Sequence, residues 1–132
     1  MKRRLKYHRL TILWALFIFI LCSIKIGNSI THQPIFFPGF DKIAHCGFFF
    51  VLVIFWSNGL IRQQNARELS YKSAIMITVL SILYGALIEV LQLTIFIWRS
   101  GEWPDLFADT IGVCMGIFAV IITGRAINYE KR

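Results

Sequence analysis

The sequence predicts an all-α membrane protein with four transmembrane helices and both termini in the cytoplasm. The chain has 132 residues, is 57% hydrophobic and has a mean hydropathy of +0.65. A soluble domain of this size could not hide so much apolar surface. The apolar residues form four runs, each about as long as the 17–25 residues that cross a bilayer core. Basic residues gather at alternate ends of these runs.

The basic residues indicate orientation in a bilayer and no nucleic-acid partner. The net charge is +7, but the Lys and Arg residues flank the apolar runs and form no separate patch. They concentrate in the N-terminus, in the loop from Arg62 to Lys72 and in the C-terminal tail, so the positive-inside rule places both termini inside. The three cysteines lie within apolar runs without metal-ligand spacing and indicate buried thiols.

We expect one domain over residues 1–132, with helices at about 10–26, 43–61, 74–97 and 105–124. No A-x-A site follows the first run, so we expect an uncleaved first helix and no removed signal peptide. Asp41 precedes the second helix and is expected to cap its first turn. Pro104 precedes the fourth helix, where proline fits a first helical position.

Glu89 is the residue that most strongly indicates a function. It is a carboxylate in an otherwise uncharged run from Thr78 to Ile97. A charge at that depth is costly and usually faces a polar interior. Gln92 and Gly85 share its helix face. The structural alternative is an ion pair between Glu89 and Lys42 or Arg99 that fixes the helix register.

The predicted topology brings further polar residues to the outer side of the membrane. Asp105 and Asp109 lie on one stripe of the fourth helix, which continues through Gly112 and Gly116, and small residues at this spacing let another helix approach closely. For Lys42 and Arg99 the alternative is a purely structural role, because basic side chains at the membrane interface often only snorkel toward water. The candidate ligand-binding residues are Asp41, Lys42, His45, Glu89, Gln92, Arg99, Asp105 and Asp109. The candidate packing residues are Gly85, Gly112 and Gly116.

The candidate catalytic residues are Glu89, His45 and Asp109, because a buried carboxyl group beside an imidazole can act as a general acid or base. A metal site built from His45, Glu89, Asp105 and Asp109 is an alternative, since carboxylates and imidazole bind divalent ions. However, no H-E-x-x-H or comparable local motif is present. The sequence therefore predicts no metal and no cofactor.

Three segments in this order resemble the VanZ-like family of bacterial membrane proteins. They are Asp41-Lys-Ile-Ala-His45, Tyr84-Gly-Ala-Leu-Ile-Glu89-Val-Leu-Gln92, and Arg99-Ser-Gly-Glu-Trp-Pro-Asp105-Leu-Phe-Ala-Asp109-Thr-Ile-Gly112. The resemblance extends from Phe40 to Gly116, but the family pattern usually has Asn in place of Asp109. It implies a multi-pass protein of the bacterial inner (cytoplasmic) membrane, a role in the cell envelope, and a link to low-level resistance to the glycopeptide teicoplanin.

Three functions fit these observations. The first is an outer-leaflet polar pocket, among membrane lipids, that binds a lipid-linked envelope precursor, a glycopeptide or another amphiphile. The second is an intramembrane hydrolase or transferase acting on lipid-linked envelope intermediates. The third is an accessory subunit of a membrane complex, in which the polar residues only hold the helices together. The sequence does not indicate an oligomeric state.

Overall fold

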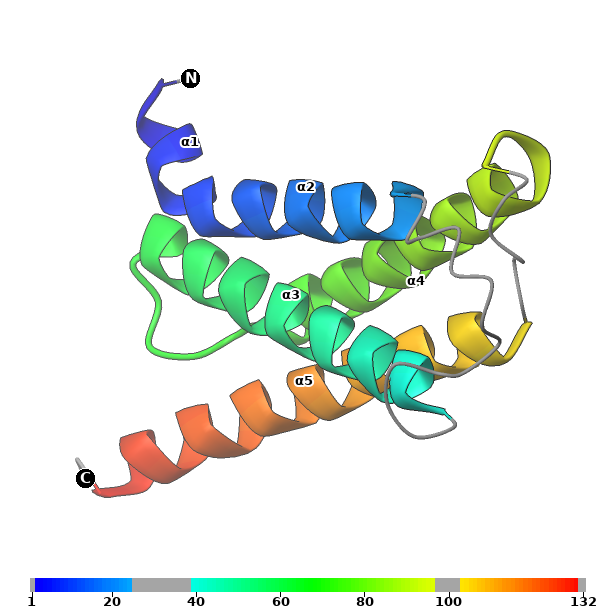
Figure 1. The fold of residues 1–132 in the computed structure, drawn as a ribbon. Coiled ribbons are helices and arrows are strands. Elements are labelled where there is room, and N and C mark those ends of the chain that lie inside the picture. The colour runs from blue at the N-terminus through cyan, green and yellow to red at the C-terminus, as the bar shows by residue number, and fades with distance from the viewer. Residues whose placement is uncertain (1, 25–38, 97–102, 131–132) are drawn as a thin grey trace.

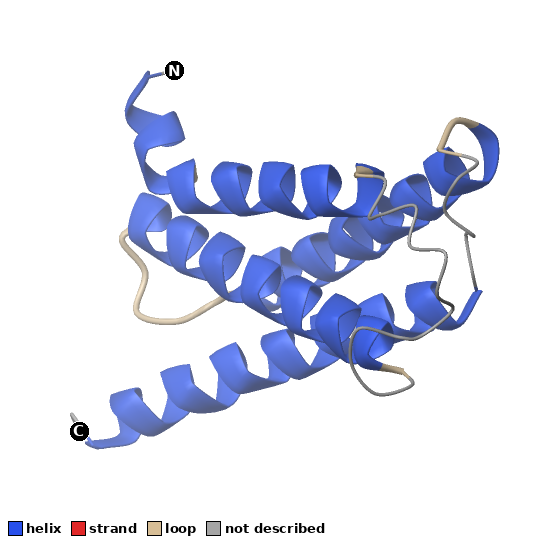
Figure 2. Cartoon of the chain, in the orientation of Figure 1, coloured by secondary structure: helices blue, strands red, loops and turns tan. Residues whose placement is uncertain are grey.

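The computed structural model of the protein describes residues 2–24, 39–96 and 103–130. These residues form five α-helices and no strand (Figures 1 and 2), so the all-α prediction is confirmed. The helices are α1 (Lys2–Tyr7), α2 (Arg9–Ser23), α3 (Phe40–Gln64), α4 (Tyr71–Thr94) and α5 (Trp103–Glu130).

Three of these helices, α3, α4 and α5, are long and apolar enough to cross a membrane. The architecture is that of a multi-pass membrane protein. In contrast, α2 has 15 residues and a length of about 22 Å at 1.5 Å per residue. The expected helix 10–26 extends too far, because α2 ends at Ser23 and Ile24 already has extended backbone with ψ of 133°. The fourth crossing therefore stays a prediction.

The other helix ends also differ from the expected ones. Helices α3 and α5 continue beyond 61 and 124 through Arg62 and Arg125, because helical hydrogen bonds do not stop where the apolar run stops. Helix α4 lies three residues earlier than the expected 74–97. Its start is set by Ser70, whose side-chain oxygen accepts a hydrogen bond from the Ser73 backbone N–H at 3.2 Å.

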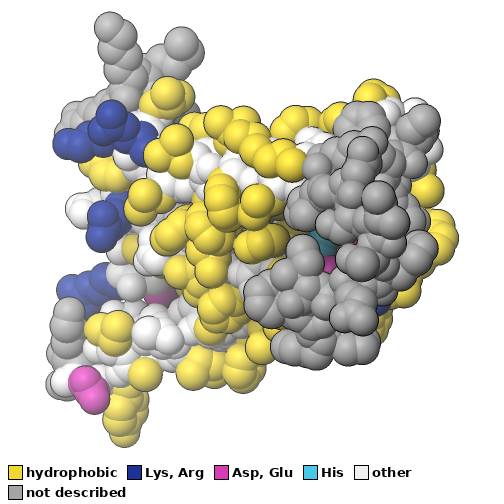
Figure 3. Space-filling model, in the orientation of Figure 1, with side chains coloured by type: hydrophobic (Ala, Val, Ile, Leu, Met, Phe, Trp, Pro, Cys, Tyr) yellow, Lys and Arg dark blue, Asp and Glu magenta, His cyan; other side chains and the backbone are white. Residues whose placement is uncertain are grey.

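Both termini and the loop between α3 and α4 lie at one end of the molecule (Figure 1). The start of α3, the end of α4 and the start of α5 lie at the opposite end. In the face shown in Figure 3, Lys and Arg side chains gather at the end that carries the termini, while hydrophobic side chains cover the middle. Large apolar side chains such as Leu83, Leu87 and Phe118 are exposed, as expected for a surface that faces lipid.

The core lies where α2, α3, α4 and α5 meet, around Ile18, Phe49, Val53, Ile77 and Val113. Helix α5 packs directly on the backbone of α3. A Cβ atom on Gly116 would lie 3.0 Å from the carbonyl oxygen of Phe50, and one on Gly112 only 2.1 Å from that of Cys46. Glycine is needed at Gly112 because the two backbones leave no room for a side chain.

Side chains that donate hydrogen bonds to backbone carbonyl groups attach α2 to the other helices. The Trp14 indole N–H donates to the Phe48 carbonyl oxygen at 2.9 Å. The Tyr84 hydroxyl donates to the Ala15 carbonyl oxygen at 2.6 Å. Such bonds satisfy the polar ends of amphipathic aromatic side chains inside an apolar bundle.

Candidate functional site

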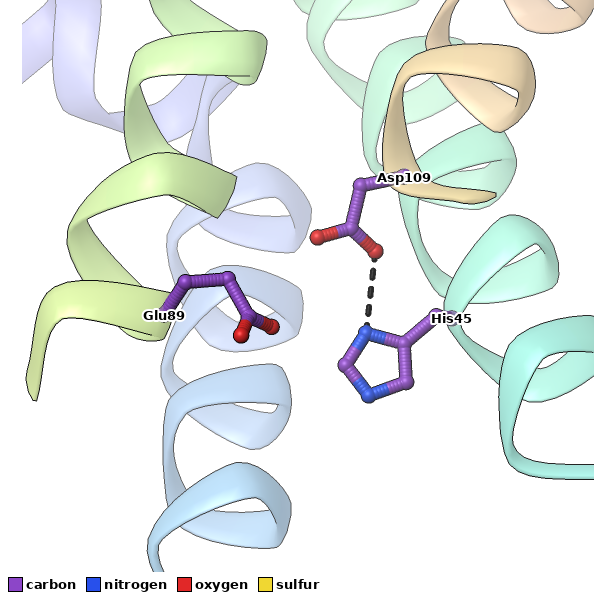
Figure 4. Close-up of side chains that lie close together, drawn as sticks. All are labelled: His45, Glu89 and Asp109. Carbon is purple, nitrogen blue, oxygen red and sulfur yellow. Dashed lines mark hydrogen bonds and ion pairs between the residues drawn. The ribbon is translucent and has the colours of Figure 1, made fainter. Parts of the chain in front are cut away.

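His45 of α3 and Asp109 of α5 form a buried pair (Figure 4). Nδ1 of His45 lies 3.0 Å from Oδ1 of Asp109, and the two residues are only 4% and 1% exposed. The close contact between Gly112 and Cys46 explains the pairing, because Cys46 follows His45 and Gly112 lies one turn after Asp109. In neutral His45, an Nδ1–H that donates to the carboxylate leaves the lone pair on Nε2.

Glu89 of α4 completes a three-residue group with this pair. One donor atom from each of His45, Glu89 and Asp109 lies within 4.8 Å of the other two, and Figure 4 shows the three side chains pointing into one space. Glu89 is buried. It lies five residues before the end of α4, which is about 8 Å along the helix axis. Because α4 ends at Thr94 and not at the expected residue 97, Glu89 lies nearer the helix end than expected.

Gly85 makes room for the Asp109 carboxylate. A Cβ atom on Gly85 would lie 2.9 Å from Oδ2 of Asp109. This oxygen is buried and has no hydrogen-bond partner among the described residues. Since Gly85 lies one turn before Glu89, Oδ2 faces the helix that carries Glu89.

Lys42 and Asp105 form an ion pair one turn away from the His45–Asp109 pair. Nζ of Lys42 lies 3.3 Å from Oδ1 of Asp105, whose side chain is 8% exposed. The same Nζ lies 3.4 Å from Oδ2 of Asp41, whose side chain is 55% exposed. Lys42 therefore connects a buried carboxylate to an exposed one.

The expected capping role of Asp41 is wrong. The N-cap of α3 is Gly39, which has φ of 86° and no side chain that could cap the helix. Asp41 lies within the first turn, where a carboxylate still interacts favourably with the helix dipole. Although Asp41 and His45 are four residues apart, Asp41 is exposed and His45 is buried.

Most of the chain matches the model of one family. The model of the VanZ/LLP1 family matches residues 6–124. The chain belongs to this family. The resemblance inferred from the three segments is thereby confirmed. No curated protein and no solved structure matches the chain.

Gln92 connects two helices of this VanZ/LLP1 chain. Its side-chain amide donates to the carbonyl oxygen of Cys22 at 3.1 Å, so it fastens α4 to α2. Two residues that were not among the sequence-based candidates, Tyr84 and Trp14, have a comparable role. The available signal was a polar atom on an aromatic ring within an apolar run. Arg99, the remaining candidate, lies outside the described residues.

The arrangement offers two kinds of chemistry. The His45–Asp109 pair holds an oriented imidazole beside a second carboxyl group, which suits proton transfer. The same nitrogen and oxygen donors suit a divalent cation. Lys42 adds a cationic group for a phosphate or carboxylate. We call Lys42, His45, Glu89, Asp105 and Asp109 the polar cluster.

Proposed function

We propose that this VanZ/LLP1 protein binds the head group of a lipid-linked or amphiphilic envelope molecule at the polar cluster. The observation that carries the proposal is the convergence of buried polar residues from α3, α4 and α5, all of them apolar helices. Burying polar groups costs free energy unless they have partners. In membrane proteins, such groups usually serve a substrate or ion site.

The surroundings of the polar cluster suit a ligand with an apolar tail. Ile43, Val90 and Phe107 are exposed, and each lies within two residues of a member of the cluster. A tail lying along these side chains would remain in the hydrocarbon region while the head group reaches the cluster. A lipid-tailed glycopeptide has the same amphiphilic form, which would connect this site to glycopeptide resistance.

The proposed location is the outer leaflet of the bacterial inner membrane. The basic end of the molecule carries both termini (Figure 3), and the positive-inside rule would place that end in the cytoplasm. Helix α2 would provide the fourth crossing. Membrane-impermeant thiol reagents test this orientation in a cysteine-free background. Asp41→Cys should react from outside intact cells, and Ala66→Cys only after permeabilisation.

The binding proposal is tested by thermal unfolding in nanodiscs with and without a polyprenyl phosphate. A ligand that binds only the folded protein raises its stability. We expect the melting temperature of the wild type to rise, with a much smaller rise in Glu89→Gln. Glu68→Gln is the matched control, because Glu68 is exposed and lies in the loop at the opposite end. No rise with a polyprenyl phosphate, a glycerophospholipid or a glycopeptide would contradict the proposal.

The His45–Asp109 pair favours a second candidate, an intramembrane hydrolase or transferase. Asp109 would orient the imidazole, Nε2 of His45 would accept a proton from water or an acceptor hydroxyl, and Glu89 would protonate the leaving group. Incubation of the nanodisc-bound protein with a polyprenyl diphosphate separates the two functions. Release of phosphate that is lost in His45→Gln supports the enzyme, whereas bound and unchanged lipid supports binding alone.

A further inference from the structure

We infer that His45, Glu89 and Asp109 bind one divalent transition-metal ion. The sequence predicted no metal, because these residues are far apart in the chain and form no local motif. The fold brings them together from three helices, with one donor atom of each within 4.8 Å of the others. The inference deepens the proposed function, and its connection to an anionic head group rests on that proposal.

The distances between the donor atoms fit an ion. Zinc binds nitrogen and oxygen ligands at about 2.0–2.2 Å, which places neighbouring ligand atoms of a tetrahedral site about 3.4 Å apart. Nδ1 of His45 and Oδ1 of Asp109 are 3.0 Å apart, so this edge of the site already has a suitable length. A donor atom of Glu89 lies within 4.8 Å of those of His45 and Asp109, and the rotatable Glu side chain is what would bring it to the same ion.

The second oxygen of Asp109 independently indicates a ligand. Oδ2 is buried, faces α4 at Gly85 and has no hydrogen-bond partner among the described residues. A buried carboxylate oxygen without a partner is costly. Nζ of Lys42 is engaged elsewhere, 3.3 Å from Asp105 and 3.4 Å from Asp41. An ion held by the Asp109 carboxylate between His45 and Glu89 would satisfy Oδ2.

The charge of the polar cluster leads to the same conclusion. Glu89, Asp105 and Asp109 carry more negative charge than Lys42 compensates, and the excess would repel the phosphate of a lipid-linked head group. A bound divalent cation neutralises this excess and leaves coordination positions open to phosphate oxygens. One imidazole and two carboxylates favour Zn²⁺ or Mn²⁺, whereas Ca²⁺ and Mg²⁺ prefer sites made only of oxygen.

The test is metal binding by the full chain in detergent, without added lipid. Protein is stripped with a chelator, titrated with ZnCl₂ or MnCl₂ in a calorimeter, and its metal content is measured after gel filtration. We expect one equivalent of Zn²⁺ or Mn²⁺ per chain. Co²⁺ should give the visible absorption of a protein-bound ion. Absence of stoichiometric binding by the wild type would overturn the inference.

The variants assign the ligands. His45→Gln and Asp109→Asn should each weaken Zn²⁺ binding at least about tenfold, because even loss of residues that support metal ligands costs this much. Glu89→Gln is used if either variant is not monodisperse in gel filtration. Glu68→Gln is the control, since Glu68 is exposed and lies in the loop at the opposite end of the molecule. An equal loss in Glu68→Gln would contradict the assignment.

The outcome is separable from that of the proposed function. Zinc binding without any lipid-dependent rise in melting temperature would support the metal site and contradict head-group binding. If the chelator-treated protein binds no Zn²⁺ or Mn²⁺ but its melting temperature still rises with lipid, head-group binding is supported and the metal site is contradicted.

Discussion

The carbonyl oxygen of Cys46 lies where a side chain on Gly112 would have to begin, only 2.1 Å from the position of a Cβ atom. This contact places the backbones of α3 and α5 against each other. It also fixes how far α3 and α5 are shifted along each other, and so brings His45 opposite Asp109. Cys46 is next to His45 on α3, and Gly112 lies one turn after Asp109 on α5. The buried pair therefore depends on a glycine that takes no part in its chemistry.

The first prediction concerns this contact. Gly112→Ala should destabilise the protein by at least about 3 kcal/mol, the upper part of the usual range for overpacking, because backbone atoms must separate. Gly47→Ala is the control, since a Cβ there meets nothing within 4 Å, and alanine should stabilise the helix by up to about 1 kcal/mol. Melting temperatures in detergent measure both. Equal stability of the two variants would show that α3 and α5 are farther apart.

Gly85 should behave differently, because its Cβ would meet a side-chain oxygen and no backbone atom. Gly85→Ala is expected to displace Oδ2 of Asp109 while the helices keep their places. We predict a loss of stability below about 2 kcal/mol, at the lower end of the range for added core volume, together with Zn²⁺ binding weakened to the extent seen in Asp109→Asn. Calorimetry on the folded variant measures the binding, and unchanged affinity would contradict the position of Oδ2.

The Lys42–Asp105 pair predicts a coupling between two residues. Removing one partner of a fully buried ion pair costs about 3–5 kcal/mol. Lys42→Met should cost less, about 2 kcal/mol, because the Lys42 side chain is 37% exposed. Asp105→Asn in the same chain should recover most of that loss. A double-mutant cycle of unfolding free energies measures the coupling, and strict additivity of the two changes would exclude the pair.

The attachment of α2 gives the next prediction. Tyr84→Phe and Gln92→Leu each remove a hydrogen bond to a carbonyl oxygen of α2, and each should cost about 1 kcal/mol. Hydrogen exchange should rise first in α2, before α3 and α5 change. Tyr129→Phe is the control, because Tyr129 is exposed on α5. Exchange that rises uniformly in all helices would show that these bonds do not hold α2 specifically.

Hydropathy was sufficient to predict α3, α4 and α5 but not where they begin and end. It detects burial in lipid, whereas helix ends depend on local hydrogen bonds such as the one that Ser70 makes with Ser73. It also overestimated the first helix, since the apolar run continues past Ser23 while the helical backbone stops there.

The residues of the candidate site could be predicted from the sequence, but the contacts between them could not. The cost of a charge in an apolar run placed Glu89 toward a polar interior, and the glycines that share the stripe of Asp109 placed that residue toward another helix. Periodicity does not say which residues on different helices meet, because that depends on how the helices slide against each other. The contact at Gly112 determines it for α3 and α5. Gln92 was grouped with the candidate ligand-binding residues because it shares a helix face with Glu89. Periodicity could not indicate that its amide contacts Cys22 on α2.

The most direct test of the account is mass spectrometry of the lipids that copurify with the protein. Wild type, Glu89→Ala and the control Glu68→Ala are compared at matched folded yield. We expect a lipid-linked or amphiphilic species that is bound to the wild type and to Glu68→Ala but depleted in Glu89→Ala. Identical lipid profiles for all three proteins would contradict a head-group site at Glu89.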